Sequence, residues 1–129
     1  PDIVLGDRYG TACAPALVDL AEIVFTGAGL RVARNRPYAG GFSTRTYGRP
    51  PHGVHALQVE ISRHLYMDEV TLEKHDGFDA VRALLDRLVL ALVDYGGAEL
   101  EQCVTGAPNL FPFKDQGPLD PPLLSPFAH

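Results

Sequence analysis

The chain has 129 residues, of which 46% are hydrophobic and 21% charged, as in an ordinary globular domain. Its 11 Lys and Arg residues against 16 Asp and Glu give a net charge of −5, which argues against a broad nucleic-acid surface, because such surfaces cluster positive charge. No apolar run approaches the roughly 18 residues of a membrane span, so we expect no membrane contact. No signal peptide is visible at the start of the sequence. The two widely separated cysteines suit neither a disulfide framework nor a zinc knuckle, so we expect a cytoplasmic protein.

The first 35 residues predict a strand, a helix and a second strand. Residues 2–5 are a short apolar run closed by Gly6, typical of a buried strand. A helix should begin near Pro15, with Thr11 as its candidate cap. Its apolar stripe consists of Leu17, Leu20, Ala21, Val24, Phe25 and Ala28. Residues 31–35 predict the second strand, and the short connections favour a parallel crossover.

A long connection and a third strand follow. Residues 36–53 are rich in Gly, Pro, Arg and Tyr, and a structureless loop of that length in a compact domain usually has a function. Residues 54–61 are almost continuously apolar, which predicts a central strand covered on both faces. Gln58 and Glu60 are its two polar exceptions, and both lie on one face.

The C-terminal third predicts one helix and a tail. The helix should span residues 76–95 and end at Gly96 and Gly97. Its apolar stripe consists of Val81, Leu84, Leu85, Leu88, Val89 and Leu92. Residues 98–129 contain six prolines and no apolar period, which predicts a poorly ordered tail after a domain of residues 1–97. The fold class is therefore α/β, part of a mixed, largely parallel sheet with flanking helices.

Two strand ends and the loop between them carry the polar residues. In open α/β sheets, sites gather at the carboxyl ends of parallel strands. Residues 34–36 (RNR) end one predicted strand, and Glu60 with residues 62–64 (SRH) ends the other. We expect these two ends to converge with the glycine-rich loop.

Glu60 is the most informative single residue, because an ionised carboxylate in an apolar strand is costly unless it is paired. One interpretation is a general base or acid near a metal-bound water. The other is a structural salt bridge to Arg63 or another arginine. Spacing alone leaves both open.

Five arginines crowd the same stretch of an otherwise acidic chain: Arg34, Arg36, Arg45, Arg49 and Arg63. Guanidinium groups bind carboxylates bidentately, which suits a small acidic ligand, although solvated loop arginines are the simpler alternative. Gly40 and Gly41 could let the backbone approach a ligand or merely form a turn. The five histidines form no metal-binding pattern, so we expect them on the surface or hydrogen-bonded.

Four motifs in order resemble the N-formylglutamate amidohydrolase family, as do the opening residues 1–6. They are residues 35–41 (NRPYAGG), 44–48 (TRTYG), 53–61 (GVHALQVEI) and 65–69 (LYMDE). The resemblance extends over about residues 1–95 and corresponds to the C-terminal half of the family's domain. It implies the α/β fold of zinc carboxypeptidases and aspartoacylase.

The same resemblance implies a zinc-dependent hydrolase that splits N-formyl-L-glutamate into formate and L-glutamate during histidine degradation. Glu60 matches the glutamate that acts as general base and then acid. Arginines of the loop would hold the substrate carboxylates, Arg45 first, followed by Arg34 and Arg63, with Tyr38, Gly40 and Gly41 beside them. The implied zinc ligands lie upstream of Pro1, so the chain itself contributes none.

Two departures from the family pattern keep alternatives open. Family members often carry His where this chain has Thr46, and the resemblance places the zinc ligands in the N-terminal half of the domain, which this chain does not match. The sequence is then a fragment or a natural truncation. One alternative is a non-catalytic remnant that binds a small acid or a partner; another is an amidohydrolase for a related N-acyl amino acid.

Overall fold

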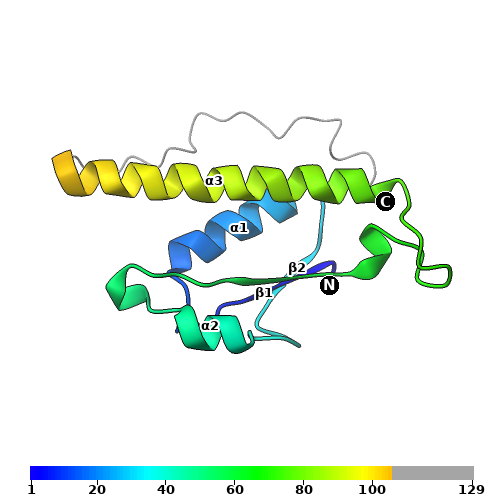
Figure 1. Cartoon of the computed structure of the whole chain (residues 1–129), viewed down its shortest axis with the longest axis horizontal. Coiled ribbons are helices and arrows are strands. Elements are labelled where there is room, and N and C mark those ends of the chain that lie inside the picture. The colour runs from blue at the N-terminus through cyan, green and yellow to red at the C-terminus, as the bar shows by residue number, and fades with distance from the viewer. Residues whose placement is uncertain (106–129) are drawn as a thin grey trace.

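A computed structural model describes residues 1–105, with side chains up to residue 98. In chain order, its elements are β1 (Ile3–Gly6), α1 (Pro15–Gly27), β2 (Val32–Arg34), α2 (Phe42–Tyr47), η1 (Pro50–His52), β3 (Gln58–Ile61), η2 (Arg63–Leu65) and α3 (Gly77–Thr105). Helices α1 and α3 stack over one side of a small sheet, and α2 lies on the other side (Figure 1). The α/β class is confirmed.

The sheet has the strand order β2-β1-β3. β1 pairs with β2 in parallel, so the predicted parallel crossover through α1 is confirmed. β3 runs antiparallel to β1, with Ile3 opposite Ile61 and Gly6 opposite Gln58. The sheet is therefore mixed, but within the described residues only one of its two pairings is parallel.

The expectation of a central strand over residues 54–61 is wrong for the described sheet. β3 covers only Gln58–Ile61 and lies at one edge, whereas β1 is central. Val54 forms a separate bridge with Arg49 and is 49% exposed. The apolar run was misleading because Leu57, Val59 and Ile61 pack on the core from one side, whereas Gln58 and Glu60 lie on the other side of the strand.

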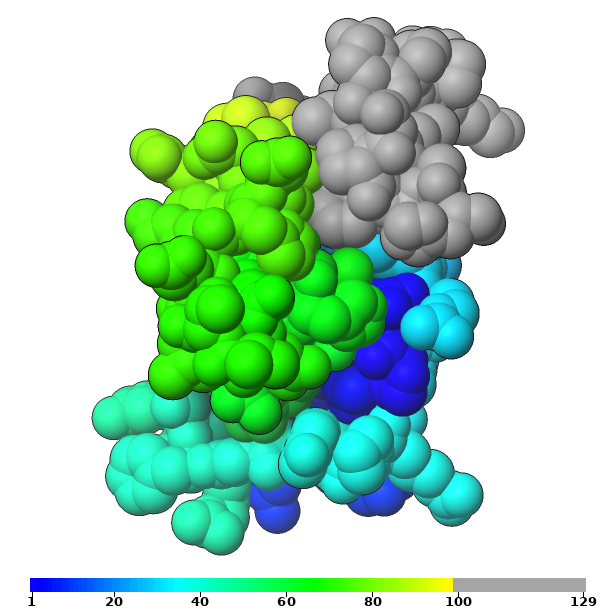
Figure 2. Space-filling view, turned by 90° about the vertical axis from the view of Figure 1, so that its right-hand side faces the viewer, coloured from blue at the N-terminus to red at the C-terminus, as the bar shows by residue number. Residues whose placement is uncertain are grey.

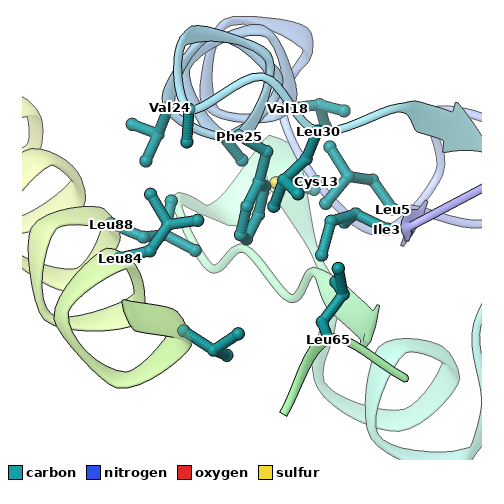
Figure 3. Packing of buried hydrophobic residues seen from close by; sticks show 13 residues of the cluster. Ile3, Leu5, Cys13, Val18, Val24, Phe25, Leu30, Leu65, Leu84 and Leu88 are labelled. Atoms are coloured by element: carbon teal, nitrogen blue, oxygen red, sulfur yellow. The ribbon is translucent and has the colours of Figure 1, made fainter. Parts of the chain in front are cut away.

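The hydrophobic core lies between this sheet and the two long helices. Leu5 of β1 and Phe25 of α1 are at most 1% exposed, and Leu84 and Leu88 of α3 close the cluster from the far side (Figure 3). Each fully buried side chain of this size contributes about 1.5–3 kcal/mol. The core thus fixes which face of the sheet is left for other functions.

Helix α1 confirms the predicted apolar stripe, but its cap is different. Ala14 is the N-cap and Pro15 opens the helix. Thr11 instead donates its hydroxyl proton to the carbonyl of Arg8 (2.8 Å), so its prediction as a cap is wrong. The backbone N–H of Ala14 is satisfied by Nδ1 of His55 at 3.1 Å, a long-range partner that local sequence does not reveal.

Helix α3 continues to Thr105, so the predicted end at Gly96 and Gly97 is wrong. Glycine in a helix interior costs only about 1 kcal/mol relative to alanine, and good helix formers follow in residues 98–102 (AELEQ). Val89, assigned to the apolar stripe, is 58% exposed. The rest of the predicted tail lies outside the described residues, and the domain boundary at residue 97 stays a prediction.

The described helices differ from membrane-spanning helices in length or in hydropathy. In the part of the chain that the structure describes, no helix is long and apolar enough to cross a bilayer.

Candidate functional site

Glu60 lies on the sheet face that points away from α1 and α3. Alternate strand residues face opposite sides, so Glu60 shares its face with Gln58, Val4 and Gly6. The side-chain amide of Gln58 donates from Nε2 to Oε1 of Glu60 at 2.7 Å. Glu60 is exposed and makes no ion pair with any described residue. The arginine salt bridge that spacing allowed is therefore not formed.

The glycine-rich loop packs on this end of the sheet. The N–H of Arg8, just after β1, donates to the carbonyl of Ala39 (2.7 Å). A Cβ on Gly6 would lie 2.8 Å from the Ala39 backbone, and one on Gly41 would lie 3.1 Å from Oε1 of Gln58. Gly40 has a φ of +135° and leaves no room for a Cβ beside Thr44. Close packing and turn geometry thus account for the glycines and bring Gly41 next to Gln58.

Asn35 organises the turn that follows β1, a role that the sequence did not reveal. Its Oδ1 accepts from the N–H groups of Asp7 (3.1 Å) and Tyr9 (3.3 Å), and its Nδ2 donates to Oδ1 of Asp7 (2.8 Å). Arg8 and Tyr9 have positive φ values of 53° and 56° within this turn. The only available signal was the pair of glycines, Gly6 and Gly10, around it.

The same turn brings a cation to the loop. A Cβ on Gly40 would lie 3.0 Å from Cγ of Arg8, so the two residues are in contact. Arg8 and Arg45 make no ion pair within the described residues. Both guanidinium groups are therefore available to an acidic ligand, and Arg8 is a candidate that the sequence reasoning missed.

Arg34 and Arg63 already have acidic partners. Register places Arg34 opposite Leu5 and hence on the helix side of the sheet, where it binds Asp19 (2.8 Å) and Glu22 of α1. The hydrogen bonds that Arg34 donates to Asp19 and, with a smaller effect, to Glu22 raise the pKa of the Arg34 guanidinium. Arg63 pairs with Glu69 at 3.4 Å.

The predicted convergence of the two strand ends is wrong, because β3 is antiparallel. Its carboxyl end lies beside the start of β1, where the N–H of Ser62 donates to the carbonyl of Asp2 (2.9 Å) and His64 Nε2 lies 3.4 Å from Asp2 Oδ1. Figure 2 views the molecule from this end of the sheet, with the N-terminal segment (blue) between the cyan and green segments. Arg63 is therefore at the opposite end of the sheet from Gly40 and Gly41.

Histidine, cysteine and carboxylate side chains are groups that could hold a metal ion or act as a nucleophile in this part of the chain. No three His, Cys, Asp or Glu side chains among the described residues come together as a metal site. Cys13 is buried, and burial raises the pKa of its thiol to about 11, which keeps it protonated and unreactive at neutral pH. As predicted, histidines take hydrogen-bonding roles, for example His75, whose Nδ1 accepts from the N–H of Gly77 at 2.9 Å.

Comparison with known proteins decides the family. The model of the family described as N-formylglutamate amidohydrolase matches residues 1–67. The chain belongs to this family. A crystal structure of N-formylglutamate amidohydrolase from Ralstonia eutropha JMP134 superposes with a TM-score of 0.70 at 46% identity, covering 73% of this chain and 34% of that one.

Two curated relatives are named N-formylglutamate deformylase. The protein from Pseudomonas aeruginosa is 37% identical over 99 residues, which are 74% of this chain and 37% of the relative. The protein from Pseudomonas putida is 30% identical over 105 residues, or 79% of this chain and 39% of the relative. The chain thus spans less than two fifths of the length of the curated relatives that it matches.

Proposed function

We propose that this chain supplies the general base and part of the substrate-binding surface of an enzyme that hydrolyses N-formyl-L-glutamate to formate and L-glutamate. Family membership supports the reaction class. The observation that carries the proposal is the state of Glu60, an exposed carboxylate held by Gln58 and not neutralised by any described cation. Such a carboxylate is free to accept and return a proton.

Proton transfer is the chemistry that Glu60 provides. As a water oxygen attacks the formyl carbon, Glu60 accepts the proton that the water loses. When the C–N bond breaks, the same carboxyl returns this proton to the departing nitrogen, so formate and the free amine of glutamate are formed. One residue then serves as base and acid in turn.

Cationic side chains provide substrate recognition. Arg45 is the first candidate for the substrate carboxylates, and Arg8 joins it because it contacts Gly40 and is also unpaired. Tyr38, Gly40 and Gly41 belong to the neighbouring loop and would lie beside the bound substrate. Arg34 and Arg63 are weaker candidates, because binding a substrate would require them to leave Asp19, Glu22 and Glu69.

The proposal has further parts. Zinc, the carboxypeptidase-like architecture of the complete domain and a place in histidine degradation come from the family resemblance, and a cytoplasmic location comes from the cysteine content of the sequence. No three side chains of the described residues come together as a metal site, so we propose that the zinc ligands come mainly from polypeptide beyond them. The roles assigned above therefore use only this chain's own residues.

The decisive experiment is Glu60→Gln in the protein expressed from the complete reading frame that contains this sequence. Loss of a general acid–base group should lower turnover of N-formylglutamate by at least about a hundredfold, while bound zinc, measured by atomic absorption, is retained. Glu73→Gln, at another exposed glutamate, is the matched control and should leave turnover unchanged. Near-normal turnover of Glu60→Gln would reject the role.

Parallel assays with N-formylaspartate and N-acetylglutamate define the substrate. Preference for either would keep the hydrolase but replace N-formylglutamate by a related N-acyl amino acid.

A second candidate is a non-catalytic protein that binds a small dicarboxylate, which the unpaired Arg8 and Arg45 favour. Calorimetric binding of glutamate by a protein without turnover would support this candidate over the enzyme.

A further inference from the structure

Gln58 is the one described side chain that forms a hydrogen bond with the proposed general base. Its Nε2 donates to Oε1 of Glu60 at 2.7 Å. The second carboxylate oxygen, Oε2, has no hydrogen-bond partner among the described residues. Because an amide oxygen cannot donate, the reverse orientation of the Gln58 amide would place two acceptors against each other, so Nε2 must face Glu60.

Gln58 is itself held from several sides. It is half-buried, whereas Glu60 is exposed. Its backbone pairs with Gly6 in the antiparallel ladder, and its Oε1 lies against Gly41 at the start of α2. The amide thus lies between the N-terminus of α2, the helix that carries Arg45, and the carboxylate of Glu60.

We propose that Gln58 is a positioning residue for Glu60, an inference that rests on the proposed function. A glutamate on an exposed sheet face can adopt many rotamers, and ordering it in the transition state costs free energy. A hydrogen bond to one oxygen fixes the carboxylate in advance and leaves Oε2 for the proton. Gln58 also links the base to Gly41, so movement of the loop would be transmitted to Glu60.

Two substitutions in the full-length protein separate positioning from packing. Gln58→Met keeps the length of the side chain but removes the donor, and it should lower kcat about tenfold, the scale of one hydrogen bond to a charged group, with little change in KM. Gln58→Glu is isosteric and places a second carboxylate beside Glu60, which favours protonation. The acid limb of its kcat/KM profile should therefore move to higher pH.

A purely structural role for Gln58 predicts a different result. The pH profile of Gln58→Glu would then coincide with that of the unmodified protein, and the kcat of any folded Gln58→Met would be unchanged. Either result would overturn the inference. Gln58→Glu keeps the test decisive if Gln58→Met does not fold.

A spectroscopic readout separates this inference from the proposed function. In NMR spectra of the full-length protein, the resonances of the Gln58 side-chain amide protons should change when Glu60 is protonated, and Glu60→Gln should abolish that change. An amide insensitive to Glu60 would defeat the positioning role even if Glu60→Gln is inactive. A sensitive amide with an active Glu60→Gln would defeat the proposed function, and with it the catalytic purpose of the contact.

Discussion

Asp2 joins three segments that are distant in sequence. It is 7% exposed, and its carboxylate accepts from the backbone N–H, Nε and Nη2 of Arg31 at 2.8–3.1 Å. Its carbonyl accepts from Ser62, and His64 lies beside its Oδ1. A buried carboxylate persists only when it is paired in this way, so Asp2 fastens the start of β1 to the segments before β2 and after β3.

This pairing predicts a pH dependence of stability. The side-chain hydrogen bond with Arg31, more than any other contact, holds the pKa of Asp2 below its usual 3.8. Because the folded pKa is the lower one, the stabilisation is fully present above pH 3.8 and is lost as the pH falls through the depressed value. Asp2→Asn should lower the free energy of unfolding at pH 7, and the difference from the unmodified protein should shrink towards pH 2.

Urea unfolding at pH 7, 4 and 2 would measure this difference. Asp86→Asn, at an exposed carboxylate on α3, is the matched control for removing one negative charge. A difference for Asp2→Asn that stays constant across the three pH values would contradict the assignment.

Elements differ in how far their residues alone define them. The periodic stripe of α1 predicted its buried face, because the helix packs with one side on the sheet and the other in solvent. The direction of β3 was not predictable, because a mostly apolar segment such as residues 54–61 is compatible with a parallel or an antiparallel neighbour. That direction separates Arg63 from the loop of Gly40 and Gly41.

Helix α3 offers a prediction at this scale. Gly97 lies inside the helix, and a Cβ there would meet no atom of the described residues within 4 Å, so Gly97→Ala should raise the free energy of unfolding by up to about 1 kcal/mol. Gly29→Ala is the matched control. Gly29 also has open space, but its φ is +82°, where alanine is strained, so that substitution should destabilise.

Thermal and urea unfolding of both variants would test the pair. If Gly97→Ala were destabilising, the continuous helix through Gly96 and Gly97 would be called into question.

At the scale of the whole molecule, the described chain is a small unit with an open site. β2 and β3 each have one edge without a strand partner among the described residues, and the Glu60 side chain is exposed. The relatives that this chain matches are more than twice as long. We infer that the proposed catalytic centre needs polypeptide beyond the described residues.

The corresponding prediction concerns the 129-residue chain by itself. With zinc added, it should show no deformylase activity above the buffer blank, because its described residues form no metal site. A chromatographic assay of formate release would measure this. Zinc-dependent formate release that disappears in Glu60→Gln would overturn the prediction and show that the chain is sufficient.

The sequence by itself determined the strand–helix–strand unit of residues 1–35, the apolar stripe of α1, the apolar stripe of α3 except Val89, and the family. These follow from local periodicity and from ordered motifs, which are written in consecutive residues. It also identified Glu60 as a candidate, because a carboxylate within an apolar run can be recognised from consecutive residues without the structure.

Only the tertiary structure decided what surrounds Glu60. The sequence showed Gln58 as a polar neighbour of Glu60, but its hydrogen bond and the approach of Gly41 depend on the strand register. The position of the unpaired Arg8 depends on the turn that Asn35 holds. Arg34 was a substrate-binding candidate in the sequence, but in the structure it forms an ion pair with Asp19 of α1. The reason is that the strand register places Arg34 on the side of the sheet that faces the helices. Pairing direction and register are set by contacts between distant residues, and no local pattern encodes them.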